Sequence, residues 1–149
     1  MFLLAFTVTS LMLSGGVEPI VSDDVYNYYP SKDGFAVYRT FKDSDERDSS
    51  YNNNGVNSPC IGSQDLVKVA TLLPDGKLMG AGYCNSSVII AVWQEDGRLF
   101  KVHDTGERKG VPFMLRYDGD PKYTVVTFLY KDPKTNANYT SQTVYDLGI

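Results

Sequence analysis

The chain has 149 residues, the length of one ordinary domain. Hydrophobic residues make up 42% and charged residues 21%, which is typical of a globular protein and too apolar for a disordered one. Eighteen acidic against fourteen basic residues give a net charge of −4, which argues against a nucleic-acid-binding protein, because such proteins usually present a basic face.

An apolar run opens the chain at residues 2–13. It is too short for a transmembrane helix, which needs about 20 residues, and it fits the hydrophobic region of a secretory signal peptide. Small residues at 14–16 predict cleavage after Gly16. We therefore expect a signal peptide at 1–16, a single all-β domain at 17–149, no membrane span and an extracellular location. The alternative is that the run forms a core strand or helix.

Two further features agree with secretion. Asn85 and Asn138 each begin an N-glycosylation sequon in an expected turn. Cys60 and Cys84 are the only cysteines, and in an oxidising compartment we expect them to form a disulfide. Such a bond would hold the end of a long polar loop, expected at 42–64, across one end of the sheet. The alternative is a pair of free thiols.

The first half of the mature chain is irregular. Residues 17–31 read as an extended lead-in that carries Tyr26, Tyr28 and Tyr29, and a strand is expected at 34–41. The loop at 42–64 contains Tyr51 and is long for a compact domain, and such loops are usually functional or disordered. These four tyrosines fall outside the regular strands, so we consider them candidate exposed binding residues.

From residue 65 onward, apolar runs alternate with turn signals such as Asp75-Gly76 and Asp96-Gly97. The pattern predicts strands at 66–73, 77–83, 87–94, 98–104, 111–117, 123–130 and 139–145. With the strand at 34–41, this makes about eight antiparallel strands in a meander.

Eight such strands predict a closed or partly closed β-barrel, with a two-sheet β-sandwich as the alternative. The strands at 88–93 and 125–130 are apolar on both faces, whereas simple barrel strands alternate. Another layer must therefore cover them: the N-terminal segment, the long loop or a second subunit, which makes a homo-oligomer an option.

The meander is similar in size to lipocalin-like barrels, although Gly34 is followed by Phe35 and Ala36 instead of the Gly-x-Trp signature of that family. In the simplest hairpin register, Gly80 and Gly82 lie opposite Ile90 and Val88. The bare face that they leave predicts either space for an aromatic ring such as Trp93 or a groove for a ligand.

No catalytic or metal-binding motif is present. His103 and Asp104 lack a placed third partner for a hydrolytic triad. The acidic residues at 43–48 are interrupted by Arg47 and lack the EF-hand pattern, so a solvated loop is expected instead of a calcium site. One histidine and two cysteines are too few for the common zinc sites built from these residues. We expect neither a metal nor a cofactor.

These observations favour a secreted, glycosylated, non-enzymatic protein that binds an extracellular protein or glycan through its loops and exposed tyrosines. The main alternative is a lipocalin-like carrier that holds a small hydrophobic ligand inside a barrel. A small hydrolase that uses carboxylates or His103 is a third hypothesis.

Overall fold

The structure, a computed structural model, describes residues 18–32, 34–51, 58–60 and 65–149. Ten strands and no helix occur in this part of the chain, and all strand pairs are antiparallel. The expected signal peptide lies outside the described residues. The strands are β1 (Val21–Ser22), β2 (Tyr26–Pro30), β3 (Val37–Phe41), β4 (Val67–Leu72), β5 (Leu78–Cys84), β6 (Ser87–Trp93), β7 (Leu99–Asp104), β8 (Val111–Asp118), β9 (Asp120–Lys131) and β10 (Asn138–Asp146).

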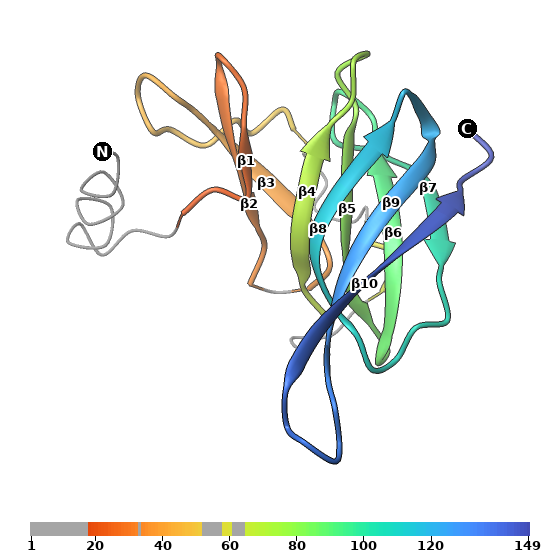
Figure 1. Ribbon diagram of the computed structural model, residues 1–149. Coiled ribbons are helices and arrows are strands. Elements are labelled where there is room, and N and C mark those ends of the chain that lie inside the picture. Colours follow the sequence, from red (N-terminus) through yellow and green to blue (C-terminus); the bar gives the residue numbers. More distant parts are fainter. Residues whose placement is uncertain (1–17, 33, 52–57, 61–64) are drawn as a thin grey trace, which may run out of the picture.

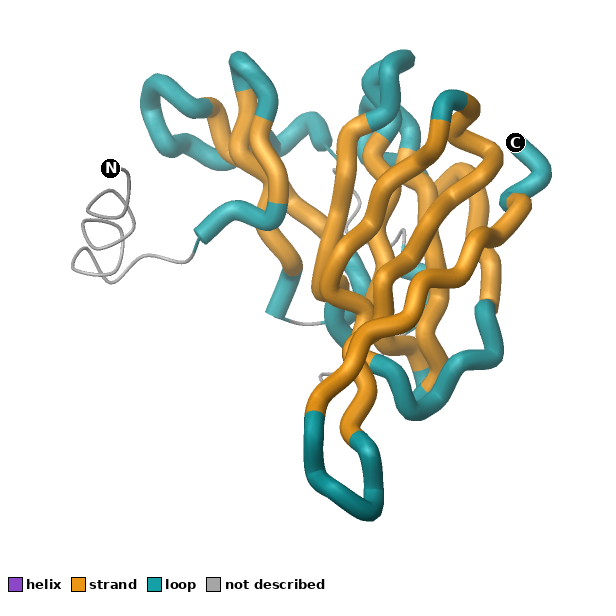
Figure 2. The backbone as a smooth tube through the Cα atoms, viewed as in Figure 1, coloured by secondary structure: helices purple, strands orange, loops and turns teal. Residues whose placement is uncertain are grey.

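The strands form three sheets (Figure 1). The N-terminal sheet has the order β1-β2-β3, the central sheet β4-β5-β6-β7, and the C-terminal sheet β10-β9-β8. Each sheet is a meander, because short turns connect strands that are adjacent in sequence. The tube view shows that the β9–β10 hairpin extends beyond the rest of the molecule (Figure 2).

The two inner strands of the central sheet, β5 and β6, are buried on both faces, and all seven residues of β6 are buried. On one face, Ile89, Ala91 and Trp93 pack with residues of the N-terminal sheet. On the other face, Val88, Ile90 and Val92 pack with Val126 and Phe128 of the C-terminal sheet. Tyr51 and Cys60 of the expected long loop belong to the first of these clusters, so the N-terminal segment and the loop together cover one face of β6, and the C-terminal sheet covers the other. No second subunit is needed to bury β6.

The expected barrel is wrong. The sheets remain separate, and the architecture is sandwich-like, with the central sheet between the other two. The physical reason is the burial of β5 and β6 on both faces, since the strands of a simple barrel bury only their inner face. The all-β class is confirmed.

The turn between β5 and β6 sets their register. Asn85 and Ser86 have φ values of 53° and 68°, as in a two-residue hairpin turn. Gly80 therefore pairs with Ala91 and Gly82 with Ile89, instead of the expected Ile90 and Val88. A shift of one residue turns a strand's side chains to the opposite face. The two glycines accordingly face the N-terminal sheet.

Candidate functional site

Arg39 lies at the centre of a buried cluster between the N-terminal and central sheets. It is only 9% exposed, and its Nε donates a hydrogen bond to Asp48 Oδ2 at 2.8 Å. The guanidinium carbon lies 3.7 Å from the centre of the Tyr26 ring and 4.4 Å from that of Tyr51. Nη1 reaches the Tyr28 hydroxyl and the backbone oxygen of Glu95, both at 3.4 Å. We call these residues, Tyr26, Tyr28, Arg39, Asp48 and Tyr51, the Arg39 cluster.

The cluster is electrostatically self-contained. Burial disfavours the charge of Asp48, but hydrogen bonds from Ser50 and Arg39 outweigh it and lower the pKa of the carboxyl group. Burial raises the pKa of Tyr28, and it raises that of Tyr51 far more strongly, so both phenols stay neutral. The guanidinium is matched by one carboxylate and by ring faces, so the cluster fits a structural role better than ligand binding.

Two expectations about tyrosines are corrected here. Tyr28 and Tyr51 are 3% and 5% exposed, so they are core residues and not exposed recognition residues. Residues 26–30 form β2, whose alternation turns Tyr26 and Tyr28 toward the core and Tyr29 to the opposite face. There, the Tyr29 ring stacks on Tyr38 with ring centres 5.3 Å apart.

Asp48 should make stability depend on pH. Because its pKa is lowered by folding, the stabilisation is present above its unfolded pKa of about 3.9 and is lost as pH falls through the folded value. We therefore expect Asp48→Asn to destabilise the protein most near neutral pH, and the difference from wild type to shrink as the wild-type carboxyl becomes protonated. Urea unfolding of both proteins between about pH 2 and pH 7 checks this. A difference that is constant with pH would contradict it.

The bare face of β5 is filled. A Cβ atom on Gly80 would lie 3.0 Å from the Trp93 ring, and Trp93 itself is 1% exposed. A Cβ on Gly82 would lie 2.0 Å from the backbone oxygen of Leu66. The glycines therefore admit an aromatic ring and the backbone of the adjoining chain segment. Gly80, Gly82 and Trp93 do not form a groove that is open to a ligand.

These contacts predict that Gly82→Ala is more destabilising than Gly80→Ala. At Gly82 the new methyl group meets backbone, which cannot rotate away, so we expect a loss toward the upper end of roughly 1–3 kcal/mol. At Gly80 it meets side chains alone, those of Trp93 and Val67, which would have to move by only a few tenths of an ångström. Chemical denaturation of both variants measures the difference, and equal losses would be evidence against the close approach at Gly82.

The disulfide between Cys60 and Cys84 is present, with a Cα–Cα distance of 5.9 Å. It joins the segment that follows β3 to the end of the central strand β5. Next to it, the backbone amide of Asn85 donates a hydrogen bond to the side-chain oxygen Oδ1 of Asp65 at 2.9 Å. Asn85 and Asn138 are both exposed, at a hairpin turn and at the start of β10, where a glycan would have space.

An open groove runs beside β4. A cavity of about 380 Å³ is lined by Ile20, Pro30, Ser31, Lys32, Tyr38, Leu66, Val67 and Lys68. A second cavity, of about 290 Å³, shares Ile20 and Lys68 with the first and continues to Phe113 and Met114 of β8. We call the two together the β4 groove. The lining of the larger cavity is mostly apolar, and it also includes Lys32 and Lys68, which are both exposed.

Sequence reasoning missed the β4 groove, because its walls come from all three sheets. Ile20 precedes β1, Tyr38 belongs to β3, Lys68 to β4 and Phe113 to β8. No local sequence pattern predicts that these residues lie close together. Of the predicted candidates, only Tyr29 lies near it, through its stacking contact with Tyr38.

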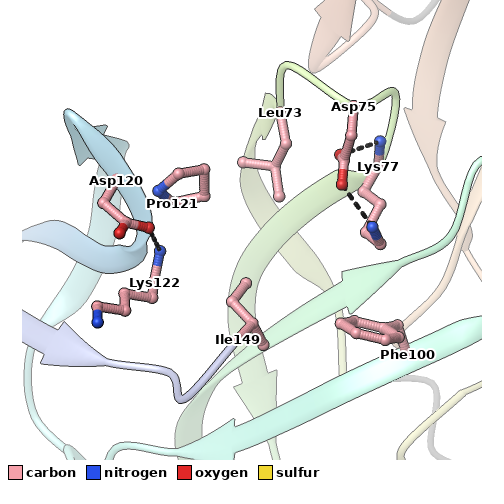
Figure 3. A pocket seen from close by; sticks show the side chains of 8 residues that line it. All are labelled: Leu73, Asp75, Lys77, Phe100, Asp120, Pro121, Lys122 and Ile149. Atoms are coloured by element: carbon pink, nitrogen blue, oxygen red, sulfur yellow. Dashed lines mark hydrogen bonds and ion pairs between the residues drawn. The ribbon is translucent and has the colours of Figure 1, made fainter.

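A smaller pocket of about 240 Å³ lies between the β4–β5 turn and the start of β9 (Figure 3). Leu73, Phe100 and Ile149 line it, together with two Asp–Lys pairs. The Asp75 carboxylate forms an ion pair with the Lys77 ammonium group at 2.5 Å, and this contact lowers the pKa of Asp75. Asp75 and Lys77 are already paired with each other, and Asp120 accepts a hydrogen bond from the backbone amide of Lys122, so the pocket is a weaker candidate than the β4 groove.

His103 and Asp104 do not face each other. They are neighbours on β7, so their side chains point to opposite faces. The His103 ring lies 5.5 Å from the Tyr145 ring, whereas Asp104 accepts hydrogen bonds from the Ser87 hydroxyl and the Gly106 amide, which lower its pKa. In the described residues, no group of three or more His, Cys, Asp or Glu is placed to hold a metal ion.

The chain was compared with protein-family models, with curated proteins and with solved structures, and none of the three comparisons finds a match. Across the described segments, no helix is long and apolar enough to cross a membrane. A fold alone does not determine a function, so the candidate sites carry the functional inference.

Proposed function

We propose that the protein is a secreted, glycosylated, non-enzymatic binding protein that recognises another extracellular protein through the β4 groove. The observation that carries this proposal is the larger cavity of the groove, whose mostly apolar lining also includes two exposed lysines. Protein interfaces combine an apolar centre with a polar rim in the same way. The disulfide is compatible with an extracellular location.

The positive charge of the groove favours an acidic partner. The whole chain carries a net charge of −4, yet Lys32 and Lys68 are the charged residues that line the larger cavity. An extended segment with acidic and apolar side chains would complement this local positive charge. Such complementarity gives specificity and speeds association more than it adds affinity.

A glycan is the second candidate partner. Tyr29 and Tyr38 stack at the groove with an interplanar angle of 16°, and each ring combines an apolar body with a polar tip. Arg47 lies 4.7 Å from the centre of the Tyr38 ring, so part of that ring is already occupied. For this reason we favour a protein partner.

The carrier hypothesis loses its premise, because it required the interior of a barrel. The two cores on either side of the central sheet are filled by large side chains, among them Trp93, Phe35 and Phe128. Phe35 stacks on Trp93 with ring centres 5.9 Å apart, so the chain's own rings occupy the space beside the bare face of β5.

Charge reversal in the groove tests the proposal. The wild-type protein, secreted from eukaryotic cells, is screened against arrays of extracellular proteins and of glycans. The Lys32→Glu/Lys68→Glu variant should bind a protein partner about tenfold more weakly or worse, since each tenfold corresponds to about 1.4 kcal/mol. A control variant, Lys131→Glu/Lys134→Glu, makes the same charge change on the distant β9–β10 hairpin and should bind normally.

Three outcomes would count against the proposal. The first is the absence of any protein partner for the wild type. The second is equal binding by the groove variant and the control variant. The third is a set of partners found only on the glycan array, which would favour the second candidate.

A further inference from the structure

The six edge strands of the three sheets differ in how well they are protected from pairing with another chain. β1 has only two residues, and the bridge between Thr40 and Arg47 covers part of β3. β4 carries Lys68 and a register shift, and β7 also combines a charged residue, Lys101, with a register shift. β8 contains Pro112 and Arg116. Short length, charge, proline and bulges are the common protections of an edge.

β10 lacks these protections along all but its last residue, the charged Asp146. It has nine residues, pairs with β9 without any register shift, and has no charged residue or proline from Asn138 to Tyr145. Tyr, Thr and Val, which favour strands, make up five of the seven residues from Tyr139 to Tyr145. Tyr139 is 52% and Val144 62% exposed. Natural proteins rarely leave such an edge unpaired, because it is a template for strand addition.

The sequence of this edge is nearly symmetric about Gln142. One residue away on either side stand the hydroxyl residues Ser141 and Thr143. Two residues away stand the β-branched Thr140 and Val144. Three residues away stand Tyr139 and Tyr145. In an antiparallel pair of identical strands centred on Gln142, each side chain would therefore meet one of its own kind.

From this we infer that β10 is the edge through which two copies of the protein associate, by antiparallel pairing of β10 with β10 across a two-fold axis at Gln142. Closed two-fold symmetry is the commonest arrangement of soluble homo-oligomers, and it requires a surface that is complementary to itself. The pairing would join two three-stranded C-terminal sheets into one six-stranded sheet and leave no free β10 edge.

The side-chain pairs of this arrangement follow from the register. Tyr139 of one copy would lie beside Tyr145 of the second, and Thr140 beside Val144, and such aromatic and β-branched pairs stabilise antiparallel strands. Tyr139 already stacks on Tyr130 at 5.3 Å, so its ring is held in place for this contact. This surface is separate from the β4 groove, and the inference does not depend on the proposed function.

Gln142 gives the test, because only a residue on the two-fold axis meets its own copy. Gln142 is exposed, so Gln142→Lys and Gln142→Glu should leave the fold intact. Each variant alone would place like charges opposite each other and should be monomeric, whereas an equimolar mixture of the two should form a heterodimer. Val102→Lys on the β7 edge is the control and should dimerise like the wild type.

Sedimentation velocity across a wide concentration range, on protein from which N-linked glycans have been removed enzymatically, measures the state of each sample. Supporting results are a wild-type dimer, two monomeric charge variants and a dimer in their mixture. A wild type that stays monomeric at every concentration overturns the inference. A wild-type dimer that persists in both charge variants, or a mixture that fails to pair, overturns it as well.

Discussion

Replacement of Arg39 by methionine is expected to lower the free energy of unfolding by about 3–5 kcal/mol, because it leaves the Asp48 carboxylate buried without its cation. The same change removes the hydrogen bond to Glu95 that links the N-terminal sheet to the turn between β6 and β7. Urea unfolding at neutral pH, followed by the fluorescence of Trp93, measures the loss.

Two controls separate charge from packing. Arg39→Met/Asp48→Leu removes both charges and should recover part of the loss, because no buried charge remains unpaired. Tyr51→Phe keeps the ring beside the guanidinium and removes a buried hydroxyl that has no hydrogen-bond partner in the described part of the chain, so it should be nearly neutral. A loss of less than 1 kcal/mol in Arg39→Met would refute the structural role of the Arg39 cluster.

Removal of the disulfide by Cys60→Ser/Cys84→Ser is expected to cost about 3.5 kcal/mol. The bond closes a loop with a sequence separation of 24 residues, and the loss of chain entropy in the unfolded state accounts for this magnitude. The comparison of guanidinium unfolding curves for the wild type and the double serine variant measures the effect.

The mechanism of this effect can be checked independently. Wild type unfolded in the presence of a reductant should match the stability of the double serine variant, because both lack the constraint on the unfolded chain. The variant should also bind any groove partner once it is folded, since neither cysteine lines the β4 groove. A variant as stable as the oxidised wild type would contradict the account.

The sequence was most informative where the pattern is local. All eight predicted strands exist. Asp75-Gly76 and Asp96-Gly97 form tight turns between two pairs of them, and both glycines adopt positive φ. The two-sided apolarity of 88–93 indicated that further layers cover the sheet, and they do. The disulfide was the only pairing that two cysteines allow.

The arrangement of the strands could not be obtained in this way. A meander can close into a barrel or separate into layers, and the difference lies in contacts between residues far apart in sequence. The sequence predicts only an extended lead-in at 17–31, yet β2 pairs along its whole length with β3. The predicted strands at 77–83 and 87–94 leave a turn of three residues, whereas the structure has a two-residue turn at Asn85-Ser86, so Gly80 and Gly82 pair one residue away from the expected partners.

One signal for the Arg39 cluster was present in the sequence. Phe35, Val37, Arg39 and Phe41 alternate along the strand at 34–41, so the arginine occupies a position on the apolar face. A charged residue at such a position predicts a buried partner, and Asp48 supplies it. The lysines of the β4 groove carry no comparable signal, because exposed lysines are common on every surface.

The central claim is that side chains of the protein fill its interior, so that recognition takes place on the surface. Native mass spectrometry of the protein secreted from eukaryotic cells, after enzymatic deglycosylation, tests this most directly. The expected result is the mass of the mature chain with one disulfide, as a monomer or a dimer, without the additional mass of a bound small molecule. Additional mass of small-molecule size that is lost on denaturation would contradict it and would show that the protein is a carrier.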